Sequence, residues 1–330
     1  MASDNRNDWR PTASIAVLKL RAQLLARIRD YFARHGVLEV ETPILSVAGS
    51  TDLHLHSFCA PSLAPGGNAA PRYLHTSPEF AMKRLIAAGS GSIYQIARVF
   101  RGGESGRRHN PEFTMLEWYR SDFDHHRLME DAAALVTETL AGFRSLAAVE
   151  KLTYGEAFVR YADIDPHHAS TRMLADCVRG HGIDARGLDD ADIDSWRDLL
   201  LTHVVEPRLG RGRLTFLYDY PASQAALARI RPGSPPLAER FELYLEGIEL
   251  ANGFHELSNE PEQRRRFEHD RSARRERGLS DVAHDERLLA ALAHGLPDCS
   301  GVALGLDRLA MLAANVASIA DVIAFPFERA

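Results

Sequence analysis

Two strand-like runs joined by a long polar loop limit what this chain can fold into. Residues 93–100 and 112–119 are rich in apolar and aromatic side chains, and residues 101–111 between them are polar and glycine-rich. This pattern predicts an antiparallel hairpin. Residues 214–257 also look strand-like, helical patterns flank both regions, and regular strand–helix alternation is missing. The sequence therefore predicts an α+β fold, an antiparallel sheet flanked by helices.

The composition excludes several classes of protein. The 330 residues are 45% hydrophobic and 25% charged, which is too apolar for a disordered chain, and the formal net charge of −6 argues against affinity built on neutralising many phosphates. Cys59, Cys177 and Cys299 lie far apart, so neither a disulfide framework nor a structural zinc site is indicated. No secretory pattern or long apolar run is present. We therefore expect a soluble, cytoplasmic protein.

The chain is expected to form one large domain. A flexible polar arm is predicted at residues 1–13, and apolar spacing over 15–32 followed by Gly36 predicts a long first helix. Residues 124–210 have a mainly helical pattern and are the best candidate for an insertion. The predicted domain is then 14–330.

A second helix is expected just before the predicted hairpin. Ser77 would be its N-cap, Pro78 its first residue, and Glu79 a favourable charge in its first turn, with the helical pattern running to Ala88. Residues 60–71 read as a loop.

The loop between the two strand-like runs concentrates groups that bind anions. Arg101, Arg107, Arg108 and His109 stand there with three glycines. Arginine offers forked donors to phosphate or carboxylate, and glycine lets backbone approach a ligand closely. A solvated basic loop is an equally good interpretation of this segment alone.

A pair of carboxylates later in the chain could hold a hard cation. Glu249 and Glu256, with Asn252 between them, offer oxygen ligands suited to Mg²⁺. Their separation of seven would point them to opposite faces of a flat strand, so convergence needs a bulge or turn, for which Asn252 and Gly253 are a plausible place. Two exposed strand carboxylates are the simpler alternative.

A glycine-spaced segment near the end of the chain reads as a strand passing into a helix. It runs from Gly301 to Leu309 and would place Arg308 in the first helical turn, at a ligand-facing edge. The alternative is an ordinary junction with Asp307 as a helix N-terminal charge and Arg308 in a surface pair.

Together and in this order, these segments resemble the catalytic domain of class II aminoacyl-tRNA synthetases, most closely lysyl-tRNA synthetase. The matching stretches are residues 77–79, 108–119, 252–257 and 305–308. The resemblance implies ATP and Mg²⁺ as cofactors and a homodimer formed around the first helix. Lysyl-tRNA synthetases also carry an N-terminal anticodon-binding domain, for which no room is expected here. The chain therefore resembles the elongation factor P–(R)-β-lysine ligase family.

That resemblance implies a role for each matching residue. Arg101 and Arg308 would be catalytic, Arg101 on the α-phosphate and substrate carboxylate and Arg308 with His109 on the outer phosphates. Phe113 would stack on adenine, Asn110 would contact the adenine edge or the backbone around it, and the metal ligands would be Glu249 and Glu256. The other nucleotide-binding residues would be Gly102, Gly103, Glu104, Leu250 and Gly305. In the amino-acid pocket, Glu79 would bind an amine, and Glu117 and Tyr119 would bind the ε-ammonium. The same pocket would contain Ser77, Pro78, Asn252, Glu256 and Ala303.

The implied reaction has (R)-β-lysine attack the α-phosphate of ATP and then pass to a lysine side chain of elongation factor P, the protein partner. Neither stable tRNA binding nor membrane association is expected. Ala303 stands where lysyl-tRNA synthetases have glycine, and its methyl group could disfavour an α-amine. Two rival hypotheses are an α-lysine-activating synthetase fragment acting on tRNA or a small acceptor, and an inactive regulatory paralogue.

Two features remain open at this stage. The family pattern F-R-N-E is replaced by residues 100–104, F-R-G-G-E, so either Glu104 swings back to the amine or water side of ATP or Gly103 supplies only backbone contacts. The histidine pairs 54/56 and 125/126 are metal ligands by type but lack a third ligand at useful spacing. We therefore expect no metal there.

Overall fold

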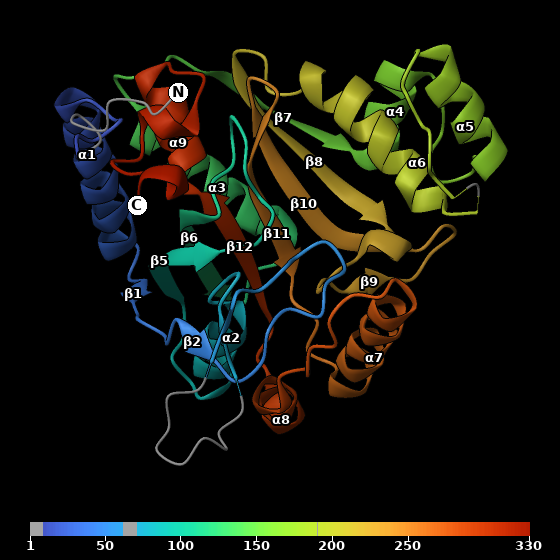
Figure 1. Cartoon of the computed structure of the whole chain (residues 1–330), viewed down its shortest axis with the longest axis horizontal. Coiled ribbons are helices and arrows are strands. Elements are labelled where there is room, and N and C mark those ends of the chain that lie inside the picture. The colour runs from blue at the N-terminus through green and yellow to red at the C-terminus, as the bar shows by residue number, and fades with distance from the viewer. Residues whose placement is uncertain (1–8, 62–70, 190) are drawn as a thin grey trace, which may run out of the picture. The chain divides into compact units, whose positions relative to one another are not determined.

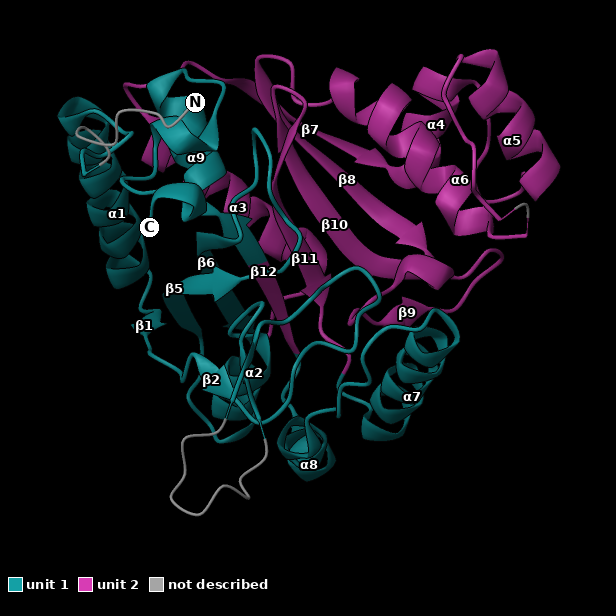
Figure 2. Cartoon of the chain, viewed as in Figure 1, with its two compact units in different colours: residues 1–121, 258–298, 303–330 teal, residues 122–257, 299–302 magenta. Residues whose placement is uncertain are grey.

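The computed structural model describes residues 9–61, 71–189 and 191–330, and it divides into two compact units (Figures 1 and 2). Unit 1 comprises residues 1–121, 258–298 and 303–330, and unit 2 comprises 122–257 and 299–302. The predicted loop at 60–71 and the arm at 1–13 fall largely outside the described residues. None of the helices in the described ranges is long and apolar enough to cross a bilayer.

Unit 1 is built around the predicted hairpin. β5 and β6 are antiparallel and β1 pairs with β5 in parallel, while β4 lies between β2 and β3 in a small second sheet. The α-helices and strands of unit 1 are α1 Ile15–Arg34, β1 Leu38–Glu39, β2 Leu45–Ser46, β3 Cys59–Ala60, β4 Arg72–Leu74, α2 Glu79–Ala87, β5 Ile93–Phe100, β6 Glu112–Ser121, α7 Glu260–Glu276, α8 Glu286–Gly295 and α9 Leu306–Ala314.

Unit 2 combines a hairpin with a helical region. β10 pairs antiparallel with β8, β9 and β11, and β7 pairs with β8 in parallel. Its α-helices and strands are α3 His125–Leu140, β7 Ala147–Thr153, α4 Tyr154–Ala162, α5 Thr171–Gly180, α6 Ile193–Leu200, β8 Arg213–Pro221, β9 Ile230–Arg231, β10 Leu237–Leu245 and β11 Ile248–His255; β12, Cys299–Gly305, begins in unit 2 and ends in unit 1.

The fold class is α+β, as predicted, although strand pairing is mixed rather than purely antiparallel. The hairpin and the first helix are confirmed. The second helix begins one residue later than predicted, because its N-cap is Pro78 and not Ser77. Ser77 still accepts a hydrogen bond from the Glu79 N–H. β7 lies inside the segment expected to be mainly helical.

α1 packs on one face of the β5–β6 hairpin through aromatic rings. Phe32 stacks on Tyr94 with ring centroids 4.2 Å apart and meets Trp118 edge-on at 5.7 Å. All three side chains are buried. Residues alternate across a strand, so the apolar positions at 94 and 118 leave the opposite face of the hairpin to residues 113, 117 and 119.

A buried aspartate ties three segments of unit 1 together. Asp307, 1% exposed, accepts hydrogen bonds from the Arg21 guanidinium of α1 and, at 2.7 Å, from the backbone N–H of Thr114 in β6. Asp307 is therefore more than a helix N-terminal charge, because it positions the start of α9 and thus Arg308 beside the hairpin.

One carboxyl group in unit 1 makes stability depend on pH. Burial raises the pKa of Asp270 in α7 to about 6, and Thr51 donates a hydrogen bond to it at 3.2 Å. Because the folded state favours the protonated form, ionisation costs folding free energy as pH rises from about 4 to 6, and the whole cost is present above that range.

We therefore expect Asp270→Asn to stabilise the protein at pH 8 but hardly at pH 4. One pKa unit corresponds to about 1.4 kcal/mol, and solvent screens a half-buried group, so a gain on the order of 1–2 kcal/mol at pH 8 is expected. Thermal denaturation at both pH values measures it. Asp281→Asn is the control, since pairing with Arg271 lowers the pKa of Asp281. An equal gain at both pH values for Asp270→Asn would contradict the assignment.

Candidate active site

One face of the β5–β6 hairpin carries three of the predicted binding residues. Phe113, Glu117 and Tyr119 are separated by even numbers on β6 and pair with Val99, Gln95 and Ile93 of β5. Even spacing on a regular strand places their side chains on the same face. The hairpin thus gathers an aromatic ring, a carboxylate and a phenol in one row.

Arg101 is held at the end of this row. Its guanidinium carbon lies 5.2 Å from the centroid of the Phe113 ring, and its Nε donates to the Thr76 carbonyl at 3.2 Å. The Glu104 carboxylate is 3.7 Å from its Nη1. Three contacts fix the side chain, which is about a quarter exposed. A fixed, accessible guanidinium is suited to an anion beside an aromatic platform.

The loop after Arg101 accommodates its departure from the family pattern through Gly103. This residue has φ +80°, a conformation that side chains other than glycine rarely adopt. The resulting turn places the Glu104 carboxylate beside Arg101. The neighbouring Gly102 donates its N–H to the His56 carbonyl at 2.7 Å, so Gly102 lies close to the backbone of another segment of the chain.

His109 and Arg308 meet although 199 positions separate them. Arg308 Nη2 lies 2.7 Å from His109 Nε2, and both belong to unit 1. Partial burial and then the charge of Arg308 lower the pKa of His109. Because a guanidinium can only donate, His109 Nε2 accepts this hydrogen bond. Gly305 is the N-cap of α9, which places Arg308 in its first turn as predicted.

Asn110 contacts backbone groups of unit 1 at both ends of its side-chain amide. Its side-chain amide donates to the Glu112 carbonyl at 2.6 Å, and its oxygen accepts from the Phe327 N–H at 3.0 Å. The side chain is buried. Asn110 therefore closes the loop onto the end of β6 and onto the C-terminal segment.

Glu117 is a buried carboxylate with neutral donors on both oxygens. Ser77 donates to Oε2 at 2.6 Å and Tyr119 donates to Oε1 at 2.7 Å, and the side chain is 2% exposed. Hydroxyl groups orient a carboxylate without neutralising it. The two hydroxyl groups thus hold the buried carboxylate in a fixed orientation.

Glu79 makes an ion pair that sequence inspection missed. Lys83, one turn further along α2, donates to Oε1 of Glu79 at 2.7 Å, and the lysine side chain is only 2% exposed. The i, i+4 spacing was the signal that could have revealed it. Glu79 is therefore already paired and is positioned by α2 as well as by Ser77.

A bulge in β11 resolves the difficulty with the two unit 2 glutamates. Glu249 pairs with Tyr244 and Ala251 pairs with Leu243, so Leu250 is an extra residue. From there the alternation runs through Asn252 and Phe254 to Glu256, all on the same face as Glu249. A bulge was predicted, but its place at Asn252 and Gly253 was wrong. Gly253 instead leaves room for the Phe241 ring, which a Cβ there would meet at 2.3 Å.

The same face of the unit 2 hairpin contains a buried ion pair that sequence inspection did not single out. Arg240 pairs with Glu242, stacks over the Tyr220 ring at 4.5 Å, and donates to Asn252 Oδ1 at 3.3 Å. The alternation of 240 and 242 with apolar neighbours was the available signal. This pair orients the predicted Asn252.

Ala303 lies beside the row on β6. It packs with Phe113 against the small apolar cluster of Ala97, Val99 and Met115. Ala303 thus lies in the apolar cluster that also contacts Phe113. Its methyl group is in a packed environment, which is the condition under which one added carbon matters.

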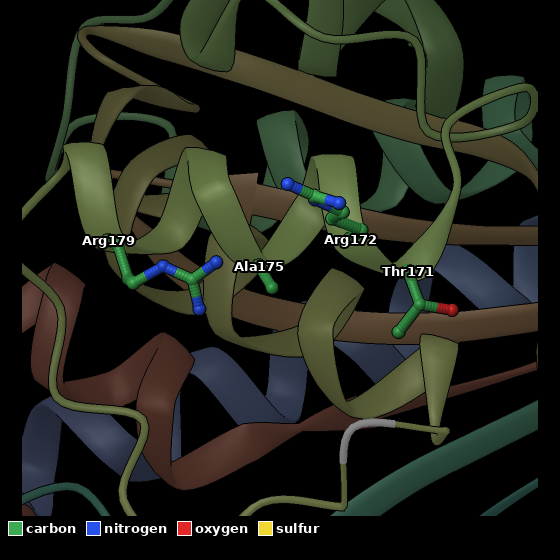
Figure 3. Close-up of a pocket in the computed structure, with 4 residues that line it drawn as sticks. All are labelled: Thr171, Arg172, Ala175 and Arg179. Carbon is green, nitrogen blue, oxygen red and sulfur yellow. The ribbon is translucent and has the colours of Figure 1, made fainter.

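A separate hollow of about 220 Å³ lies on α5 and is lined by Thr171, Arg172, Ala175 and Arg179 (Figure 3). Arg179 pairs with Asp176 at 2.6 Å, while the Arg172 side chain is 91% exposed. An open hollow with solvated arginines is a surface feature, and none of the predicted site residues line it.

Comparison with known proteins places this geometry in a class. The family model described as tRNA synthetases class II (D, K and N) matches residues 4–329. A class II synthetase fold is thereby shown for nearly the whole chain.

Curated relatives narrow the family further. The elongation factor P–(R)-β-lysine ligase of Vibrio cholerae serotype O1 is 50% identical over 325 residues, covering 98% of this chain and 99% of the relative. The ligase of the same name from Yersinia enterocolitica is 50% identical over 323 residues, covering 98% of each. The chain belongs to the class II synthetase family, in the branch of the elongation factor P–(R)-β-lysine ligases.

Proposed function

We propose that this chain is an ATP-dependent ligase that activates (R)-β-lysine and transfers it to a lysine side chain of elongation factor P. The observation that carries the proposal is the row on β6, with Phe113 beneath Arg101 at one end and the buried Glu117 toward the other. A nucleotide base needs an aromatic platform and a phosphate cation, and an ε-ammonium needs a buried carboxylate. The names of the relatives supply the substrates.

The proposed roles follow the chemistry of each group. Phe113 stacks on adenine, Arg101 binds the α-phosphate and the substrate carboxylate, and Arg308 with His109 binds the outer phosphates. Glu117, oriented by Ser77 and Tyr119, receives the ε-ammonium. Glu79, which is paired with Lys83, receives the other amine.

The reaction conserves charge and atoms in two steps. A carboxylate oxygen of β-lysine attacks the α-phosphorus and pyrophosphate leaves, giving an aminoacyl-adenylate. The neutral ε-amine of the acceptor lysine then attacks the acyl carbon, loses a proton, and displaces AMP. Arg101 stabilises the charge that develops on the α-phosphate, and alignment of the reactants supplies much of the remaining rate.

Divalent cation binding is proposed for unit 2. Glu249 and Glu256 offer carboxylate oxygens on one strand face, with Asn252 between them, which is a donor set that fits Mg²⁺. When bound, Mg²⁺ neutralises phosphate charge. Glu256 is buried and Glu249 is half-buried.

The experiment that tests the function is substrate-dependent ATP–pyrophosphate exchange with (R)-β-lysine and with α-lysine, followed by transfer to elongation factor P. We expect exchange with (R)-β-lysine to exceed that with α-lysine, and radiolabel to appear on the acceptor protein. Transfer to tRNA in place of the acceptor would overturn the assignment of partner. Background exchange with both isomers would overturn the enzymatic assignment.

Ala303→Gly is expected to improve the use of α-lysine. Removal of one methyl group from a packed pocket changes discrimination by about 1–3 kcal/mol, or roughly 10–200-fold. The measurement is the ratio of kcat/KM for the two isomers in the exchange reaction. Ala97→Gly, a change of the same size in the same cluster, is the matched control. An unchanged ratio in Ala303→Gly would show that position 303 does not select the isomer.

Location in the cytoplasm is proposed because the acceptor is a translation factor. A homodimer is proposed because unit 1 exposes apolar side chains in β1 and β2. Leu38 is 56% exposed and Leu45 is 51% exposed. Exposed apolar side chains of this size are enriched where proteins associate.

The double variant Leu38→Glu/Leu45→Glu is expected to shift the protein to monomer, with a rise in the dimer dissociation constant of at least 100-fold because two charges would be buried. Sedimentation velocity measures it. Val159→Glu, on an equally exposed apolar residue of α4, is the control. A monomeric wild-type chain at micromolar concentration would refute the dimer.

A further inference from the structure

Unit 2 brings together two histidines and a glutamate that are far apart in the sequence. His125 is the first residue of α3, Glu239 lies in β10, and His255 is the last residue of β11. One ligand atom from each lies within 4.8 Å of the others. The sequence shows no further ligand near His125, because the other two ligands belong to β10 and β11, more than a hundred residues later.

The register of the β10–β11 hairpin explains how two of them meet. Arg240 pairs with Phe254, so Glu239 and His255 are opposite one another on the other face of these strands. The His255 Nδ1 and a Glu239 oxygen are 2.6 Å apart. Glu249, Asn252 and Glu256 occupy the opposite face. The cluster is therefore separate from the Mg²⁺ ligands proposed above.

His125 gives the observation that points to a ligand. Its side chain is 2% exposed, and neither ring nitrogen has a hydrogen-bond partner. Its Nε2 is 3.6 Å from Asp219 Oδ1, which is too long for a hydrogen bond. A buried imidazole that makes no hydrogen bond of normal length carries a desolvation cost that coordination to a metal ion would remove.

The charges around the cluster leave room for a cation. Asp219 and Glu239 contribute two negative charges, and Arg231, 2.6 Å from Asp219 and 3.7 Å from Glu239, contributes one positive charge. These three groups sum to one net negative charge beside the two histidines, which favours a bound cation.

We propose that His125, Glu239 and His255 bind a Zn²⁺-class transition-metal ion that fastens α3 to the β10–β11 hairpin. Two imidazoles and one carboxylate are a ligand set that suits Zn²⁺ or Co²⁺ and not Mg²⁺. Ligand atoms about 2.0 Å from a tetrahedral ion lie roughly 3.3 Å apart. The His255 and Glu239 atoms, which are 2.6 Å apart, would therefore separate by about 0.7 Å on binding. Asp219 is placed to orient His125.

The test is a Co²⁺ titration of the full chain after removal of metal with a chelator, in excess Mg²⁺ so that oxygen-rich sites are occupied. We expect one equivalent per chain to give the visible absorption bands of a low-coordinate Co²⁺ ion, and Zn²⁺ to abolish them. The same Zn²⁺ should raise the melting temperature, since binding to the folded state alone stabilises it. A wild-type chain that gives no such bands at one equivalent overturns the proposal, whatever the variants do.

Variants assign the ligands. His125→Ala and His255→Gln should each weaken Co²⁺ binding at least tenfold and remove the Zn²⁺-dependent rise in melting temperature, with the far-ultraviolet circular dichroism spectrum confirming that they fold. His126→Ala is the matched control, because this neighbouring histidine is exposed and outside the cluster. Equal loss in His126→Ala, or full binding in His125→Ala, would overturn the assignment.

Discussion

Arg101→Ala should reduce the rate of (R)-β-lysine-dependent pyrophosphate exchange by about 1,000-fold. Arg101 is held by the Thr76 carbonyl, the Phe113 ring and Glu104, so its guanidinium loses little freedom when it meets a phosphate. Removal of one preorganised group that stabilises developing charge costs roughly 10²–10³ in rate. The effect should fall mainly on kcat, because the interaction strengthens in the transition state.

Two further variants make this prediction specific. Arg101→Lys keeps the charge but loses the planar fork, and it should recover only part of the rate. Arg84→Ala removes a guanidinium from an exposed position of α2 in the same unit and should leave exchange unchanged. If Arg101→Ala altered only the KM for ATP, the residue would contribute uniform binding and not catalysis.

Local patterns were sufficient for much of the fold. The β5–β6 hairpin and α1 were predictable because each combines a clear apolar period with end signals that lie within a few residues. α8 and β7 were not singled out. β7 has exposed residues over most of its length, so its strand conformation comes from pairing with β8 and not from its own pattern.

In the candidate site, too, features set by local sequence could be predicted, and features set by tertiary packing could not. The row of Phe113, Glu117 and Tyr119 follows from the period of two along one strand, and the turn at Gly103 follows from a local substitution. The bulge at Leu250 could be expected in kind but not located, because its position depends on how β10 packs. His125, Glu239 and His255 could not be grouped from sequence at all, since tertiary structure alone brings α3 to this hairpin.

Glu117→Gln is expected to reduce kcat/KM for (R)-β-lysine by roughly 100–1,000-fold with little change in the KM for ATP. Glutamine keeps the size of the side chain and can still accept a hydrogen bond from Ser77 or Tyr119, but it cannot balance a buried ammonium ion. Loss of one partner from a buried ion pair costs about 3–5 kcal/mol. The measurement is exchange kinetics with varied amino acid at saturating ATP.

The hydroxyl groups on either side of Glu117 separate a charge effect from a geometric one. Tyr119→Phe and Ser77→Ala each remove one donor while leaving the carboxylate charged, so each should cost only about tenfold or less, close to a single hydrogen bond. Because Ser77 also accepts from the Glu79 N–H, its variant should destabilise the start of α2 slightly more than Tyr119→Phe does. A loss in Tyr119→Phe as large as in Glu117→Gln would mean that the phenol, and not the carboxylate, recognises the substrate.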